Sequence, residues 1–396
     1  GARGSRASAT QTVAVNQQGV EHALRIVVDR GPITFRCGSS SGGDEYVAET
    51  TLLTGEHSLS FTPTTANFYI QFLSENRNLK RVNSITVEGA GVMELPTPWV
   101  TADLDTMRFA QSADVVFVAC RGYQQRRIER RSARSWSVVL YQSDDGPFTV
   151  SRTANVRLKP SVNEGNGTLT ASSAFFNANH VGALFRLFHP TYDMTFKLAG
   201  EDTYTEEIRV SGIGSDNTAY RTIAGTWSGT IFNHRSYEGK GVGFIPIGTG
   251  TTTNGSFSID PGTEWDNVIH YYRYGFRPGD YTSGVADVTI TYEGGGDYGI
   301  CRVISVASST VANIEILRPF VNTDYTSDWR EGEWSNNRIW PSATVLSDGR
   351  LWWSGQDRIW GSVSDAFDSF DEDIEGDSGP ISRSIATGGV NDTQWL

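Results

Sequence analysis

Short runs of alternating apolar and polar residues recur along this chain, and they constrain its fold more than any other feature. In the run 21–29, His22, Leu24, Ile26 and Val28 fall on one side, as in a half-buried strand. Similar runs occupy 33–37, 59–62, 67–72 and 84–88, and glycine- and serine-rich turn clusters such as 38–44 separate them. No stretch of twelve residues has the period of an amphipathic helix, although 101–109 could form one short helix. The sequence therefore predicts an all-β protein.

Length and composition narrow the class of protein further. A chain of 396 residues exceeds one compact domain, so several domains are expected. The 19 Phe, 15 Tyr and 11 Trp give enough apolar surface to exclude disorder, and no run approaches the ~20 apolar residues of a membrane helix, so no membrane insertion is expected. The net charge of −12 argues against a protein whose whole surface grips nucleic acid. Only four of the 33 basic residues are lysines, so arginine carries nearly all the positive charge.

Turn signals and composition divide the chain into four segments. Residues 1–94 are expected to form a jelly-roll-like β-sandwich, and the proline-containing stretch 95–99 reads as a linker. Segments 95–155 and 326–396 are expected to form two parts of a propeller-like platform, because both contain short hairpins and Asp348-Gly349 is a strong hairpin turn. Residues 156–325 would form an inserted small β-barrel or β-sandwich region. The abrupt start and stop suggest a piece of a longer polypeptide.

Two charged clusters stand out as candidate subunit interfaces. The basic one has six arginines within 14 residues: Arg121, Arg126, Arg127, Arg130, Arg131 and Arg134. The acidic one, 365–377, includes Asp368, Asp371, Asp373 and Asp377. Arginine suits planar, bidentate contacts with carboxylates, so one cluster could meet the other on a neighbouring subunit. The alternative for the arginines is a solvated hairpin that protects a sheet edge, and for the acids a solvated loop.

Tryptophans form a third cluster, and no catalytic pattern accompanies them. Six of them lie within 32 residues, at Trp329, Trp334, Trp340, Trp352, Trp353 and Trp360. They could be sugar-stacking platforms, but at hairpin spacing they are more typical of a core. The six histidines lack metal-ligand spacing, and the acidic segment fails the EF-hand pattern because Ser382 stands where the bidentate Glu belongs. We expect no catalytic residues, no metal and no cofactor.

Several motifs resemble large structural tail proteins of short-tailed bacteriophages. They are ADVVFVA at 113–119, QQRRIER at 124–130, DDGPF at 144–148, DWREGEWS at 328–335, GRLWWSG at 349–355 and IWGSVSDAFDSF at 359–370. The family they resemble most is the tail nozzle, or tail tubular protein B-like, family. Its members are often described with an insert similar to the first catalytic-cysteine half-domain of ubiquitin-activating enzymes, which would correspond to 156–325 and implies no ubiquitin chemistry.

The resemblance implies a non-enzymatic component of the virion, made in the host bacterial cytoplasm. It implies a homo-oligomeric ring, commonly of six copies, that contacts tail, adaptor and fibre proteins and forms part of the conduit for the ejected genome. Double-stranded DNA would pass without specific binding, because a negatively charged lumen repels its backbone. The alternatives are a host-surface or carbohydrate-binding tail adhesin and, third, a virion glycosidase.

Overall fold

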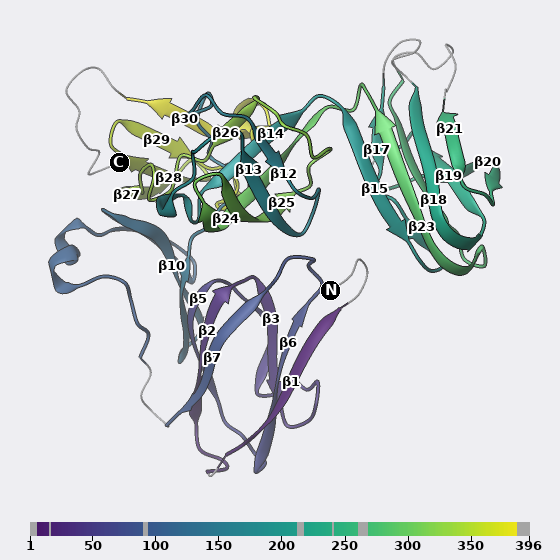
Figure 1. Ribbon diagram of the computed structural model, residues 1–396. Coiled ribbons are helices and arrows are strands. Elements are labelled where there is room, and N and C mark those ends of the chain that lie inside the picture. The colour runs from purple at the N-terminus through teal and green to yellow at the C-terminus, as the bar shows by residue number, and fades with distance from the viewer. Residues whose placement is uncertain are drawn as a thin grey trace.

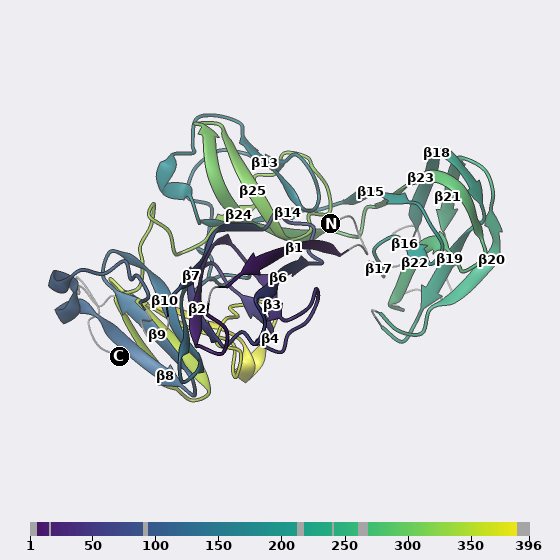
Figure 2. The same cartoon turned by 90° about the horizontal axis from the view of Figure 1, so that it is seen from below.

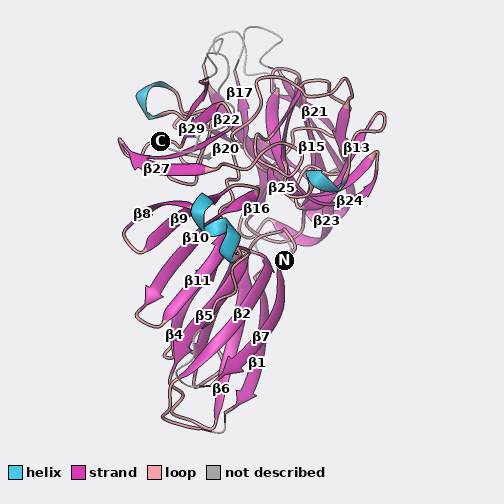
Figure 3. Ribbon diagram, turned by 90° about the vertical axis from the view of Figure 1, so that its left-hand side faces the viewer, coloured by secondary structure: helices cyan, strands magenta, loops and turns pink. Residues whose placement is uncertain are grey.

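Antiparallel strands form nearly all of the regular secondary structure that is described. The computed structural model describes residues 6–15, 17–89, 94–211, 218–239, 241–259 and 268–385. Among these residues the helical elements are three 3₁₀ turns, η1 (Thr101–Thr106), η2 (Ala178–His180) and η5 (Gly376–Ser378) (Figure 3). The predicted all-β, multidomain fold is confirmed. In the part of the chain that the structure describes, no helix has the length and apolar composition that crossing a bilayer would require.

The N-terminal segment contributes strands to two sheets that share one core. One sheet has the order β1 (Ala7–Ala14), β6 (Asn67–Ser74), β3 (Ile33–Gly38) and β4 (Val47–Leu52). The facing sheet begins with β7 (Arg81–Glu88), β2 (His22–Arg30) and β5 (Gly55–Phe61). The alternating residues identified in the sequence supply the core between them, with Leu24 and Ile26 on one side and Phe35, Phe68 and Ile70 on the other.

This second sheet continues into the segment that follows the predicted linker. Beyond β5 it adds β11 (Ser135–Leu140), β10 (Tyr123–Ser132), β9 (Val115–Cys120) and β8 (Arg108–Ser112). Gly55 on β5 pairs with Val139 on β11, where the sheet passes from the sandwich to this segment. The φ of Gly55 is +147°, and a Cβ on Gly55 would lie 2.4 Å from the carbonyl oxygen of Val138. Glycine permits this close approach, so a single sheet runs across the domain boundary expected near residue 95.

The C-terminal segment is a four-stranded meander that packs against this extension. Its strands are β27 (Ala343–Ser347), β28 (Arg350–Gly355), β29 (Arg358–Gly361) and β30 (Ile381–Ser384). Asp348 and Gly349 join β27 to β28 with φ values of 51° and 70°, which confirms the predicted hairpin turn. Trp353 and Trp360 meet Phe117 and Tyr141 in a shared core. A four-stranded antiparallel meander is the form of a propeller blade.

The middle of the chain contains two separate hydrophobic cores. A six-stranded sheet has the order β12 (Leu158–Pro160), β13 (Asn166–Ala171), β25 (Val311–Arg318), β24 (Asp297–Ser308), β14 (Leu184–His189) and β26 (Trp329–Glu331). Its apolar side has its own core, which includes Leu169, Phe185, Ile314 and Trp329.

An insert between β14 and β24 forms the second core. One of its sheets is β15 (Tyr192–Leu198), β23 (Tyr281–Tyr292), β18 (Ala219–Gly229) and β21 (Gly255–Ile259). The other is β16 (Thr203–Tyr204), β22 (His270–Phe276), β19 (Ile231–Ser236) and β20 (Ile245–Thr251), with β17 (Ile208–Val210) paired to β22. Figures 1 and 2 show the insert as a separate lobe. Phe196 and Ile290 from one sheet and Tyr274 from the other share its core, so the two sheets form a sandwich.

Candidate functional site

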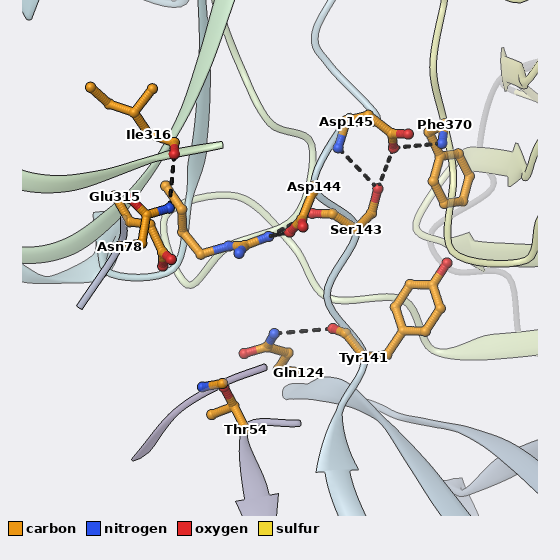
Figure 4. Close-up of polar contacts among 12 residues, drawn as sticks. Thr54, Asn78, Gln124, Tyr141, Ser143, Asp144, Asp145, Glu315, Ile316 and Phe370 are labelled. Atoms are coloured by element: carbon orange, nitrogen blue, oxygen red, sulfur yellow. Dashed lines mark hydrogen bonds and ion pairs between the residues drawn. The ribbon is translucent and has the colours of Figure 1, made fainter. Parts of the chain in front are cut away.

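A polar junction lies where the N-terminal sandwich, the six-stranded sheet and the C-terminal meander meet. A cavity of about 530 Å³ lies there, lined by the turns at Gly31 and Thr54, by 142–145, by β25 and by 366–369. Figure 4 shows the polar contacts around it. The side chains at this junction come from segments separated by up to about 300 residues. Their contacts therefore hold distant parts of the chain together.

A buried ion pair joins the sandwich to the six-stranded sheet. Lys80 Nζ lies 3.2 Å from Glu315 Oε1 on β25, and their side chains are only 5% and 7% exposed. Lys80 also donates to the carbonyl oxygen of Gly31 at 3.0 Å, and nearby Asn78 Nδ2 donates to the carbonyl oxygen of Ile316 at 2.9 Å. Each buried charge compensates the desolvation of the other, so either one alone would be costly.

The segment 143–145 forms the second part of the junction. Arg302 on β24 donates to the carbonyl oxygen of Ser143 at 2.6 Å and to Asp144 Oδ1 at 2.9 Å. Asp145 accepts hydrogen bonds from Ser143 Oγ and from the Phe370 backbone N–H, each at 2.7 Å (Figure 4). It accepts a third from Ser369 Oγ at 2.6 Å. The carboxylate of Asp145 thereby holds residues 369 and 370 of the acidic segment against the segment 143–145.

Arginines from two different sheets clasp the acidic segment 365–377. Arg127 on β10 donates to Asp368 Oδ2 at 2.6 Å, Arg186 on β14 to Glu372 Oε2 at 2.6 Å, and Arg318 on β25 to Asp373 Oδ2 at 2.8 Å. Burial alone would raise the pKa of Asp373, but hydrogen bonds from Arg318 and Tyr298 outweigh it and hold this pKa below its ordinary value. The acidic segment therefore links β10 to the six-stranded sheet.

Tyr298 on β24 organises two of these arginines. The guanidinium carbons of Arg186 and Arg318 lie 3.7 and 3.8 Å from the centre of its ring. Arg318 also donates to both carboxylate oxygens of Asp297, each at 3.0 Å. Stacking on a ring leaves the guanidinium edge available for carboxylates, a combination that lysine cannot provide.

The predicted arginine cluster is largely engaged within the chain. Arg131 donates to Ser137 Oγ at 3.0 Å, to Thr50 Oγ1 at 2.6 Å and to the carbonyl oxygen of Thr51 at 2.9 Å, and it also pairs with Glu129. These bonds tie β10 to the sandwich. Arg127 and Asp368, proposed from the sequence to meet between subunits, meet here inside one chain.

The other arginines of the cluster lie nearer the surface, with one exception. Arg130 pairs with Asp114 at 3.4 Å and Arg134 with Glu21 at 3.0 Å, and their side chains are 49% and 48% exposed. Arg126 is the exception because its guanidinium is largely buried. This burial lowers the pKa of the guanidinium, with an opposing contribution from Glu56. Arg121 is exposed, in the turn between β9 and β10.

The remaining predicted acids also act within the chain. Asp371 Oδ1 accepts from the Asp373 backbone N–H at 3.0 Å and lies 3.5 Å from Tyr298 Oη. The buried Arg350 donates to the carbonyl oxygens of Asp377 and Gly379. Across the described ranges, no group of three His, Cys, Asp or Glu side chains is placed to hold a metal ion.

The tryptophans are mainly core residues. Trp329, Trp334, Trp353 and Trp360 are buried, the first in the six-stranded core and the other three in the core beneath the meander. Trp340 and Trp352 are partly exposed, and Trp340 Nε1 donates to Asn336 Oδ1 at 2.7 Å. Of the two interpretations drawn from the sequence, packing accounts for the four buried residues.

The junction residues lie outside the charged and aromatic clusters of the sequence. They are Lys80, Glu315, Arg302, Arg186 and Arg318. A signal was present, because Arg186 stands alone in the apolar run 184–188 and Glu315 stands alone in 314–317. A lone charge inside an apolar strand implies a partner on another element, but its identity depends on contacts far apart in sequence.

Comparisons with known proteins do not identify a relative. No protein-family model matches the chain, and no curated protein matches it. A solved structure of an IolB-like protein from Salmonella typhimurium LT2 is 9% identical, with a TM-score of 0.15, over 72% of this chain and 81% of that chain. A similarity this weak supports no conclusion about fold or activity.

Proposed function

We propose that the protein is a structural component of a bacteriophage tail, a nozzle-like ring subunit that forms part of the conduit for the ejected genome. The observation that carries this proposal is the junction, where the Lys80–Glu315 pair and the clasped acidic segment join three sheet systems. A conduit subunit has to keep its parts fixed while DNA passes, and interlocked charged contacts across sheets serve that purpose. The tail-protein motifs of the sequence support the same function.

The contacts of the junction are suited to rigidity because they are coupled. An isolated surface ion pair contributes only about 0–1 kcal/mol. Here one acidic segment is held by arginines from β10, β14 and β25, so releasing it requires several pairs to break together. The Lys80–Glu315 pair adds a buried contact whose separation would leave two uncompensated charges.

Subunit contacts in the proposed ring would use charges that remain accessible. Arg130 and Arg134 keep about half of their side-chain surface exposed, whereas Arg127 and Arg131 are mostly buried. A cyclic ring joins one patch to a different patch on the next copy, so these arginines would face an acidic surface of the neighbour. Other tail, adaptor and fibre proteins would bind the ends of the ring, in the virion.

Negative-stain electron microscopy of the purified chain tests this function. We expect closed rings, and Arg130→Glu combined with Arg134→Glu should convert them to monomers with an unchanged thermal melt. Arg209→Glu on β17, which is exposed on the insert, is the matched control and should leave the rings intact. Monomers at every concentration of the unaltered chain would refute the ring.

A tail adhesin that binds carbohydrate is the second candidate. One observation favours it, namely an arginine–aromatic cluster on the insert, a part of the protein that takes no part in the junction. A glycan array probed with the whole chain separates the two functions, because a purely structural subunit should bind no glycan.

A further inference from the structure

Arginines and aromatic rings gather on one face of the insert, on the sheet that contains β16, β22 and β19. In the strand register His234 is opposite Arg273, while Phe232 and Tyr204 both lie opposite Gly275. Residues directly opposite each other on antiparallel strands project to the same face. Tyr274, one position along from Arg273, points into the core instead. The cluster therefore occupies the face turned away from the core of the insert.

Aromatic rings hold Arg273 in place. Its guanidinium carbon lies 4.1 Å from the ring centre of Tyr204 and 4.4 Å from that of Phe244. Among the described residues no carboxylate lies within 4.0 Å of it, and its buried Nε has no hydrogen-bond partner. Arg277 differs, because it stacks on Phe232 at 3.5 Å but is neutralised by Asp280, 2.6 Å from its Nε. Within the described ranges, Arg273 is thus an oriented cation without a counter-charge.

The imidazole of His234 adds a second buried polar group to the cluster. It is 4% exposed, its ring centre lies 5.2 Å from that of Tyr204, and no polar atom of the described chain bonds its Nδ1. Burial lowers its pKa to about 4, helped by the charges of Arg273 and Arg277 and opposed by a hydrogen bond with the Phe232 backbone and by Asp280. The imidazole is therefore neutral at pH 7 and can donate one hydrogen bond. A buried polar atom without a partner is costly unless a ligand supplies one.

We propose that this cluster binds the carboxylate of an acidic saccharide, with Arg273 and His234 as its donors. A planar guanidinium matches a carboxylate with two parallel hydrogen bonds, and aromatic rings beside it offer apolar surface to the C–H face of a sugar. The insert stands apart from the rest of the chain (Figure 2), so a polymer could reach it. The site does not depend on ring formation.

Binding of the whole chain to oligogalacturonates and sialyl-lactose, measured by calorimetry, tests the proposal. The carboxyl-reduced form of each saccharide and a short single-stranded oligonucleotide serve as ligand controls. Arg273→Gln removes the oriented cation and should weaken binding at least about tenfold, the loss typical of a charge-assisted hydrogen bond. Arg209→Gln changes the charge of the same lobe equally, but Arg209 is exposed and donates to Ser211 Oγ at 3.1 Å, so it is the matched control.

The outcomes are distinct. Binding of at least one carboxylated saccharide but not its reduced form, lost in Arg273→Gln and kept in Arg209→Gln, supports the site. His234→Phe should weaken binding as well, and equal melting temperatures of the variants confirm that they fold. Any one of four results would overturn the proposal. They are no binding to either carboxylated saccharide, equal binding of the reduced forms, equal losses in both arginine variants, and tighter binding of the oligonucleotide. Ring images report separately on the tail function.

Discussion

The buried Lys80–Glu315 pair makes the strongest prediction about how this protein is held together. In Glu315→Gln the shape of the side chain is kept but its charge is lost, so Lys80 is left buried with only neutral oxygens, such as the carbonyl oxygen of Gly31, as acceptors. Removing one partner of a buried pair costs about 3–5 kcal/mol, because the remaining charge is uncompensated. We expect Glu315→Gln to lower the free energy of unfolding by that amount.

Two comparisons isolate the effect of burial. The Lys197–Asp287 pair on the insert has a similar contact distance, 2.7 Å, but its side chains are 74% and 36% exposed. Asp287→Asn should therefore cost no more than about 1 kcal/mol. Lys80→Met combined with Glu315→Leu removes both buried charges together, and it should recover most of the stability that Glu315→Gln loses.

The assay has to report on the junction itself, because a chain with several cores need not unfold in one step. Urea titration followed by tryptophan fluorescence gives the stability, and hydrogen exchange of the backbone amides of 76–80 and 313–317 gives the local opening. Faster exchange confined to these segments would confirm that the pair joins the sandwich to the six-stranded sheet. A loss below about 1 kcal/mol in Glu315→Gln, or a double variant as unstable as the single one, would refute the reasoning.

Three further predictions follow from buried groups elsewhere. Trp353→Ala should cost about 3–5 kcal/mol in thermal or urea unfolding, whereas Trp352→Ala, at a partly exposed site, should cost about 1 kcal/mol. Burial lowers the pKa of His57 from 6.5 to about 4 in the folded chain. As the pH falls from 6.5 to 4, the unfolded chain therefore binds a proton before the folded chain does, and the free energy of unfolding decreases by up to about 3 kcal/mol. His57→Gln should flatten this part of a melting-temperature profile. Arg350→Lys should lose hydrogen bonds to carbonyl oxygens around residues 362–379 and speed proteolysis there, and unchanged cleavage would contradict this role.

Local structure was predictable because it depends on neighbours in the sequence. The alternating runs 33–37 and 67–72 predict strands, and β3 and β6 contain them. The turn at Asp348-Gly349 was predicted from two residues that tolerate positive φ, and both adopt it. Burial of most of the clustered tryptophans followed from their spacing along hairpins.

The way the sheets join was not predictable, because it depends on pairings between distant segments. The sequence around Gly55 and Val139 does not indicate that β5 and β11 pair across more than eighty residues. The same holds for 156–325, where the sequence predicts one inserted barrel or sandwich region. Two cores form instead, because the insert has its own core and its flanking segments build a separate sheet. Alternation identifies strands and their apolar faces, but many strand orders satisfy the same pattern.

The preference for arginine over lysine now has a physical explanation at several positions. Arg186 and Arg318 each stack on Tyr298 while binding a carboxylate at the guanidinium edge, and Arg350 donates to several carbonyl oxygens at once. Both uses need a planar group with several donors, which an ammonium lacks. Since these arginines are used inside the chain, the bias by itself does not locate a subunit interface. An interface has to be sought among arginines with exposed surface, which is why Arg130 and Arg134 are the residues to reverse.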